Sequence, residues 1–372
     1  MRGIRIWALL LVAGGCAQAA PPRVLHLAPN GDDRWSGSLP APNLEGTDGP
    51  LASLSRLQAA IRAERTAHPG SDVVAYLRGG TYPLTETMAL GPEDAGAGGG
   101  SVVWEAFPGE QPIIDGGRPI RGFAVRADGL WEVQLPAGFA SFEQLYVNGA
   151  RVPRARTPNH GYFYLAGTIA AAVDPATGKE GPVADQAFKA RLRDLGPLPT
   201  LAPEQLEDVV VSAYHSWEIS RHRLRAIDPE HGLVFLRGKY PPKFGHYAQE
   251  ERYRLENYRA ALDEPGEWLL ETDGRLLYLP RTGDDPATAE VMAAGPETML
   301  RLAGTVAQPL ARLSFRGLTF RHAGYLLPPE GAWSPQAACN VGAAIEADHA
   351  HDLRFEECTV ERTGGYAIWF RN

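Results

Sequence analysis

Residues 313–324 read LSFRGLTFRHAG, and residues 353–364 repeat this pattern as LRFEECTVERTG. Leu, Phe, Thr and Gly recur at matching places between position 313 and position 353, a spacing of 40 residues. A second repeat, GAAI at 342–345 and GYAI at 365–368, has a spacing of 23 residues. The 17 residues of the segment 325–341 account for the difference. The sequence therefore predicts a coil of about 23 residues, one copy of which is enlarged by this segment.

Short strands that repeat at this period favour a β-solenoid, in which stacked coils bury one continuous apolar core. We expect Phe315 to stack on Phe355 and Ile345 to stack on Ile368. The last residues, AIWFRN at 367–372, form an apolar strand without a polar cap. Because a bare strand edge is an aggregation hazard, this pattern predicts that the natural protein continues with further coils.

The N-terminus has the pattern of a secretory signal peptide over residues 1–19. A basic start is followed by a short apolar run, and Ala17-Gln18-Ala19 forms a small-residue cleavage site. We therefore predict export to the periplasm or the extracellular space, with a lipid anchor at Cys16 as the alternative. No later stretch has the ~18 consecutive apolar residues that a membrane span needs.

The chain is acidic, with a formal net charge of −8. Removing residues 1–19 takes away two arginines and brings the charge to about −10, which argues against nucleic acid or an anionic membrane as partner. Cys339 and Cys358 remain, and we expect two small buried side chains rather than a disulfide. Neither cysteine belongs to a metal-ligand motif, so no metal and no other cofactor is predicted.

One amphipathic helix is predicted ahead of the repeats. Ser53 or Ser55 can cap its N-terminus. Apolar residues then recur at helical spacing; they are Leu54, Leu57, Ala60 and Ile61. A single helix in front of a string of short strands is suited to cover the exposed end of a solenoid.

Between residues 124 and 295 the pattern changes to short strands separated by turns such as Asn148-Gly149, which favours antiparallel hairpins. We therefore expect four parts. They are a signal peptide at 1–19, an N-terminal cap with the first coils at 20–123, an inserted β-rich domain at 124–295, and further, incomplete coils at 296–372.

Several stretches resemble bacterial right-handed parallel β-helix proteins that act on polysaccharides. They are WSG at 35–37, TDGP at 47–50, LRGGTY at 77–82, ENY at 256–258, LDEPGEW at 262–268, GRLLYLP at 274–280, FRH at 320–322 and QAA at 336–338. The group is similar to glycoside hydrolases with fucosidase- or xylanase-type activities on plant cell-wall glycans and, more distantly, to pectate lyases. The resemblance implies an all-β chain, a right-handed parallel β-helix with an N-terminal capping helix and an inserted antiparallel β-domain. It also implies a polysaccharide or oligosaccharide as partner.

Six residues are candidates for contacts with a sugar. His215, Trp217 and Arg221 lie on one strand of the expected insertion, where an indole can stack on a sugar face and a guanidinium can bind hydroxyls or a carboxylate. The others are placed on or beside the 17-residue segment; they are His322, Trp333 and Gln336. Core packing and loop packing are the alternative roles for all six.

Glycoside hydrolysis needs two carboxylates, one as general acid and one as nucleophile or base. The visible coils offer several carboxylates; they are Glu346, Asp348, Glu356, Glu357 and Glu361. A solvated outer face is the more ordinary role for each. The resemblance places the catalytic carboxylates beyond residue 372, so no catalytic residue is assigned in this chain.

Three functions remain open. The first is an exported glycoside hydrolase acting on a plant-type or other extracellular polysaccharide, with its catalytic coils outside this chain. The second is a polysaccharide lyase, which would use a basic residue and calcium. The third is a non-catalytic chain that binds glycans.

Overall fold

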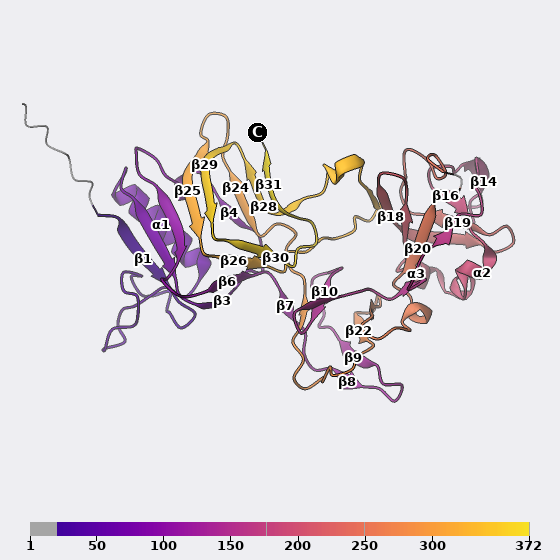
Figure 1. Cartoon of the computed structure of the whole chain (residues 1–372), viewed down its shortest axis with the longest axis horizontal. Helices are drawn as coiled ribbons and strands as arrows, with labels where there is room; N and C mark the ends of the chain where they lie inside the picture. The colour runs from indigo at the N-terminus through magenta and orange to yellow at the C-terminus, as the bar shows by residue number, and fades with distance from the viewer. Residues whose placement is uncertain (1–20, 176, 249, 372) are drawn as a thin grey trace, which may run out of the picture.

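The computed structural model describes residues 21–175, 177–248 and 250–371. The expected signal peptide at 1–19 and the alternative lipid anchor at Cys16 lie outside these ranges. The described chain is mostly β-strand, and Figure 1 shows it as three parts in a row: parallel sheets with α1, a middle group of hairpins around β9 and β22, and a distal sheet around β18. None of its helices is long and apolar enough to cross a membrane.

The strands on both sides of the insertion form three parallel sheets. The first contains β1 (Arg23–Leu27), β2 (Val73–Leu77), β5 (Val102–Ala106), β25 (Leu310–Arg316) and β29 (Ala350–Glu356). The second contains β3 (Gly80–Pro83), β6 (Pro112–Asp115), β26 (Thr319–Arg321) and β30 (Thr359–Glu361). The third contains β4 (Met88–Leu90), β24 (Leu300–Ala303), β28 (Ala343–Asp348) and β31 (Tyr366–Arg371). From β2 onward, and leaving out the insertion, successive strands of the chain enter the three sheets in turn.

The repeat found in the sequence sets the register of these sheets. Phe315 pairs with Phe355, and their rings stack with centroids 4.9 Å apart. Ile345 pairs with Ile368 in the neighbouring sheet. Both expected stacks are therefore confirmed. Phe315 and Ile345 belong to one apolar core between the three sheets, and Phe355 packs against it. Phe315 is 2% exposed, whereas Ile368, on the last strand, is 39% exposed.

The predicted helix is α1 (Leu54–Ala67). Ser53 is its N-cap, and the Ser53 hydroxyl accepts a hydrogen bond from the backbone N–H of Arg56. The four apolar residues expected on its inner face are all buried. They join the core of the parallel sheets beside β1, so the helix packs where it was predicted to (Figure 1).

The middle part consists of two antiparallel sheets. One contains β7 (Arg118–Pro119), β10 (Leu145–Val147), β11 (Ala150–Val152) and β23 (Val291–Ala293). The other contains β8 (Ala124–Val125), β9 (Trp131–Gln134), β21 (Trp268–Leu270) and β22 (Arg275–Tyr278). Asn148 and Gly149 join β10 to β11, and both have positive φ, which a tight hairpin turn of this kind requires.

The distal part is an eight-stranded antiparallel sheet with short helices beside it. Its strands are β12 (Arg156–Thr157), β13 (Phe163–Tyr164), β16 (Ala187–Lys189), β17 (Val210–Tyr214), β18 (Ile219–Asp228), β19 (Leu233–Leu236), β20 (Arg252–Glu256) and β27 (Ala332–Trp333). The small elements are β14 (Ala171–Val173), β15 (Glu180–Pro182), α2 (Leu192–Leu195) and α3 (Pro203–Leu206). Short 3₁₀ turns lie at Pro92–Asp94, Leu198–Thr200, Arg259–Ala261 and Gln336–Ala338.

The 17-residue segment 325–341, here called the partition loop, connects the first part to the third. It leaves the parallel sheets after β26, adds β27 to the distal sheet next to β18, and returns to β28. Cys339 lies on this loop and is exposed, so the expectation of a buried side chain is wrong for it, because the loop leaves the core. Cys358 is half-buried, and both cysteines are free thiols.

Candidate functional site

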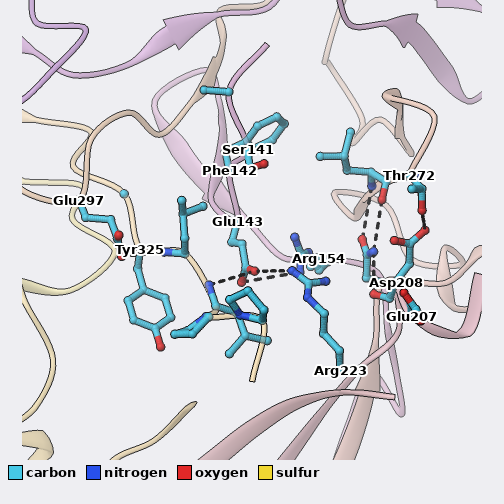
Figure 2. Close-up of a pocket in the computed structure, with 18 of the residues that line it drawn as sticks. Ser141, Phe142, Glu143, Arg154, Glu207, Asp208, Arg223, Thr272, Glu297 and Tyr325 are labelled. Carbon is cyan, nitrogen blue, oxygen red and sulfur yellow. Dashed lines mark hydrogen bonds and ion pairs between the residues drawn. The ribbon is translucent and has the colours of Figure 1, made fainter. Parts of the chain in front are cut away.

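A cleft of about 1570 Å³ is lined by residues of all three parts. Most of its lining residues come from five stretches, at 134–143, 204–208, 270–274, 324–334 and 340–342; the others are Arg154, Arg223, Asn257, Glu297 and Gly365. Phe139, Tyr325 and Trp333 supply aromatic surface, and Arg223 supplies a cation. We call this hollow the main cleft; Figure 2 shows part of it.

Glu143 is the centre of a charged cluster in the wall of the main cleft. Its side chain is only 4% exposed, and three arginines surround it. The shortest nitrogen–oxygen distances are 3.8 Å to Arg154, 3.6 Å to Arg221 and 3.4 Å to Arg223. Figure 2 shows Arg154 and Arg223 on the same side of Glu143. The Glu143 carboxylate is thus fully engaged in ion pairs with these arginines.

A second carboxylate, Glu256, completes the cluster. It lies 3.2 Å from Arg221 and accepts a 2.7 Å hydrogen bond from the Ser212 hydroxyl. Burial opposes the ionisation of Glu256, yet the charge of Arg221 holds its pKa below the ordinary value. Burial likewise opposes the charge of Arg221, and Glu256 and Glu143 raise the pKa of this guanidinium nonetheless. Both groups therefore remain charged beside Glu143.

The two carboxylates of the main cleft that remain open to a ligand are Glu204 and Glu297. Glu207 pairs with Arg237, and Asp208 accepts from the Thr272 backbone and hydroxyl. Glu271 and Asp273 both pair with Arg275. Among the described residues, Glu204 and Glu297 have no cation within ion-pair distance, and Glu297 accepts only the backbone N–H of Leu326.

The partition loop is fixed by side chains from the middle part. The Gln144 amide accepts from the backbone N–H of Tyr325 at 2.7 Å and donates to the Tyr325 carbonyl at 2.9 Å. Glu297 accepts from the next N–H, of Leu326, and Glu143 accepts from that of Leu327 at 3.2 Å. Three successive backbone N–H groups are therefore held by three different side chains, which positions Tyr325 at the cleft.

A second, smaller hollow of about 490 Å³ adjoins the partition loop. Tyr325 and Ser334 line both hollows. Trp217 and Arg221 reach it from the distal sheet, and Arg151 reaches it from β11. We call it the Trp217 groove. Two of the six residues predicted to contact a sugar thus come together here, and their role in binding stays a prediction.

The two histidines of that prediction are buried. The side chain of His215 is 0% exposed; its Nδ1 lies 2.9 Å from a Glu251 carboxylate oxygen and its ring stacks on Tyr240. The side chain of His322 is also 0% exposed and is held by Asp115, 2.7 Å away. A direct contact of either histidine with a sugar is therefore wrong as a prediction, because both imidazoles already bind buried carboxylates.

Trp333 and Gln336 have different positions on the partition loop. Trp333 is half-buried, lines the main cleft and packs edge-on against Tyr240. Gln336 is exposed and lines neither hollow. The candidate carboxylates of the coils also lie outside both hollows. Most of them carry surface ion pairs, Glu346 with Arg301 and Glu356 with Arg316 among them, as a solvated outer face would.

Sequence reasoning missed the Glu143 cluster. One signal was present in the sequence, because residues 221–225 read RHRLR and place three arginines on one face of β18. Such a row needs acidic partners. The partners of Arg221 and Arg223 are Glu143 and Glu256, which lie far away in the sequence, and nothing in their own neighbourhoods identifies them.

No protein-family model matches the chain, and no curated protein matches it. A solved structure described as a glycoside hydrolase is similar, with a TM-score of 0.73 and 20% sequence identity over 92% of this chain. The chain spans about 62% of the length of that structure. At this identity the match shows a shared fold.

Two further solved structures are weaker matches. A complex of XylC with xylose has a TM-score of 0.37 and 13% identity, over 89% of this chain and 40% of that one. A tailspike of the Acinetobacter baumannii bacteriophage AP22, in complex with a capsular saccharide, has a TM-score of 0.16 and 7% identity, over 80% and 33%. Scores this low support no argument about the chain.

Proposed function

We propose that the three parallel sheets are the faces of a right-handed parallel β-helix and that the chain is an exported carbohydrate-active protein of the glycoside hydrolase class. The order in which successive strands enter the sheets supports the β-helix. The similarity in fold to a glycoside hydrolase supports the class. The signal-peptide pattern of residues 1–19 supports export.

The main cleft is the proposed binding site for an oligosaccharide stretch of an extracellular polysaccharide. Its size and lining are the observation that carries this proposal. At about 1570 Å³ it exceeds the ~300–1,000 Å³ of a typical small-ligand site, so it has room for several sugar rings. Tyr325 and Trp333 offer ring faces to sugar C–H groups, and Arg223, 29% exposed, offers N–H donors to hydroxyls.

We expect this chain to bind an oligosaccharide without hydrolysing it. Hydrolysis requires one carboxyl as acid and a second across the scissile bond. In the described part of the main cleft, Glu143, Glu207, Glu271 and Asp273 are engaged by arginines, which leaves Glu204 and Glu297 as the carboxylates without a cation partner. We do not expect these two to act as a catalytic pair. Catalytic carboxylates are expected from coils other than those described.

Isothermal titration of the chain with neutral xylo- and fuco-oligosaccharides tests the binding site. Arg223→Gln should weaken binding about tenfold, because it removes a charge-assisted hydrogen bond. Arg225→Gln is the matched control: Arg225 lies on the same strand and pairs with Asp174, outside the cleft. Equal loss in both variants, or no binding to any glycan tested, would refute the proposed site.

An assay for new reducing ends and for unsaturated sugars separates the alternatives. Unsaturated products that require calcium would favour the lyase. Reducing ends released by this chain would place catalysis within it, and Glu204→Gln and Glu297→Gln would then identify the carboxylates, since these two are free of arginine partners. Binding with neither product is the outcome we expect.

A further inference from the structure

The Trp217 groove has an unusual combination of an exposed aromatic ring and an unpaired cation. Trp217 is 66% exposed, which leaves most of the indole accessible to solvent. Arg151 is exposed on β11, and no hydrogen bond or ion pair of its side chain is found in the described part of the chain. The other arginine of the groove, Arg221, is engaged by Glu143 and Glu256.

Two other polar side chains of the groove, Glu218 and Gln144, are already engaged. Glu218 accepts a 2.8 Å hydrogen bond from the Tyr240 hydroxyl and is 9% exposed, so its charge is directed into the distal sheet. The Gln144 amide is fully used by the backbone of Tyr325. Arg151 is therefore the one charged side chain of the groove, among the described residues, that is accessible and still lacks a partner.

We propose that the Trp217 groove binds a negatively charged sugar, a uronate residue of the polysaccharide, with its ring on Trp217 and its carboxylate on Arg151. A sugar ring stacks on an indole through its C–H face, and a guanidinium binds a carboxylate through two parallel N–H groups. The groove volume of about 490 Å³ accommodates one or two sugar rings. This deepens the proposed function, because it specifies which glycans the protein selects.

The position of the groove gives this specificity a structural basis. The partition loop separates it from the main cleft, and Tyr325, Ala332 and Ser334 line both. A glycan whose neutral sugars lie in the main cleft can therefore place an acidic substituent, or its next acidic sugar, across the partition loop in the Trp217 groove. The acidic balance of the exported chain, about −10, disfavours an anionic glycan, so an accessible cation at this point favours its binding.

Titration with trigalacturonate and with its neutral counterpart, trigalactose, tests the inference, with heat and intrinsic tryptophan fluorescence as readouts. The chain should bind trigalacturonate more tightly, and the difference should shrink as salt is added. Arg151→Gln should weaken trigalacturonate binding about tenfold or more and leave trigalactose binding unchanged. Trp217→Ala should weaken both.

Arg121→Gln is the matched control. Arg121 is exposed, has no side-chain hydrogen bond or ion pair among the described residues and lies outside both hollows. The variant therefore changes the net charge by the same amount as Arg151→Gln. Equal weakening by Arg121→Gln and Arg151→Gln, or equal affinity of the wild type for the two ligands, would overturn the uronate site. Failure of the proposed function is distinguishable, because that proposal depends on Arg223 and neutral oligosaccharides.

Discussion

Replacing Glu143 by Gln should be among the most destabilising isosteric substitutions in the protein. The side chain is 4% exposed and lies 3.4–3.8 Å from three guanidinium groups. At an effective dielectric constant of ~20, each such pair corresponds to an attraction of about 4 kcal/mol before desolvation is counted. Glutamine keeps the shape, and its amide oxygen can still accept the N–H of Leu327. The substitution therefore removes the charge while keeping the volume, and it replaces the second acceptor oxygen, which faces Arg154 and Arg221, with an N–H2 donor.

The expected loss of stability depends on the arginines that remain buried without their carboxylate. Arg154 is 9% exposed and packs 5.0 Å from the centre of the Trp268 ring, so it cannot reach bulk water once Glu143 is neutral. Breaking a buried pair in this way costs about 3–5 kcal/mol. The midpoint of urea unfolding, read by far-ultraviolet circular dichroism, measures this loss. Glu207→Gln, which breaks an exposed pair with Arg237, should cost less than about 1 kcal/mol.

A double variant tests the cause. If the uncompensated charge of Arg154 produces the loss, Glu143→Gln combined with Arg154→Met should recover much of the stability, because an apolar side chain then replaces a buried cation. The reasoning is refuted if Glu143→Gln costs no more than Glu207→Gln. It is also refuted if adding Arg154→Met to Glu143→Gln lowers the stability further, by as much as Arg154→Met costs on its own.

Three further outcomes are expected. Burial raises the pKa of Glu267 to about 7, above its ordinary value of 4.5, so between these pH values the folded protein binds a proton that the unfolded chain does not. The free energy of unfolding should therefore fall by up to about 3 kcal/mol as the pH rises from 4.5 to 7. Urea unfolding of Glu267→Gln across this range should lack this pH dependence. Phe315→Ala should cost about 3–5 kcal/mol in the same assay, whereas Phe370→Ala, 58% exposed, should cost far less. Ser53→Ala should cost about 1 kcal/mol by removing the cap of α1, and Ser53→Thr should restore most of it.

The parallel sheets could be predicted from the sequence because their contacts follow from a repeat. Identical side chains at a fixed spacing meet in register, and the pairs formed by Phe315 and by Ile345 did so. The cap of α1 was predictable for a local reason, since Ser53 and the N–H that it accepts are three residues apart.

The candidate sites were less predictable because their partners are distant in sequence. His215 and His322 had the right chemistry for a sugar, but each binds a carboxylate that no local pattern assigns to it, Glu251 and Asp115. Trp217 was expected on a strand of the insertion, but it lies in the turn between β17 and β18, where it is 66% exposed. Its role in binding stays a prediction. The main cleft itself is made of stretches from three parts, which no single motif records.

The partition loop makes the insertion inseparable from the coils that carry it. A gene deletion that joined β6 directly to β24 would remove Gln144 and Glu143, which hold the backbone of Tyr325 and Leu327, together with the strand on which Trp333 is hydrogen-bonded. The 17-residue partition loop, which belongs to a later coil, would lose all of these contacts together. Insertion and loop must therefore be exchanged as a pair when chimaeras are built, and in natural relatives their lengths should change together.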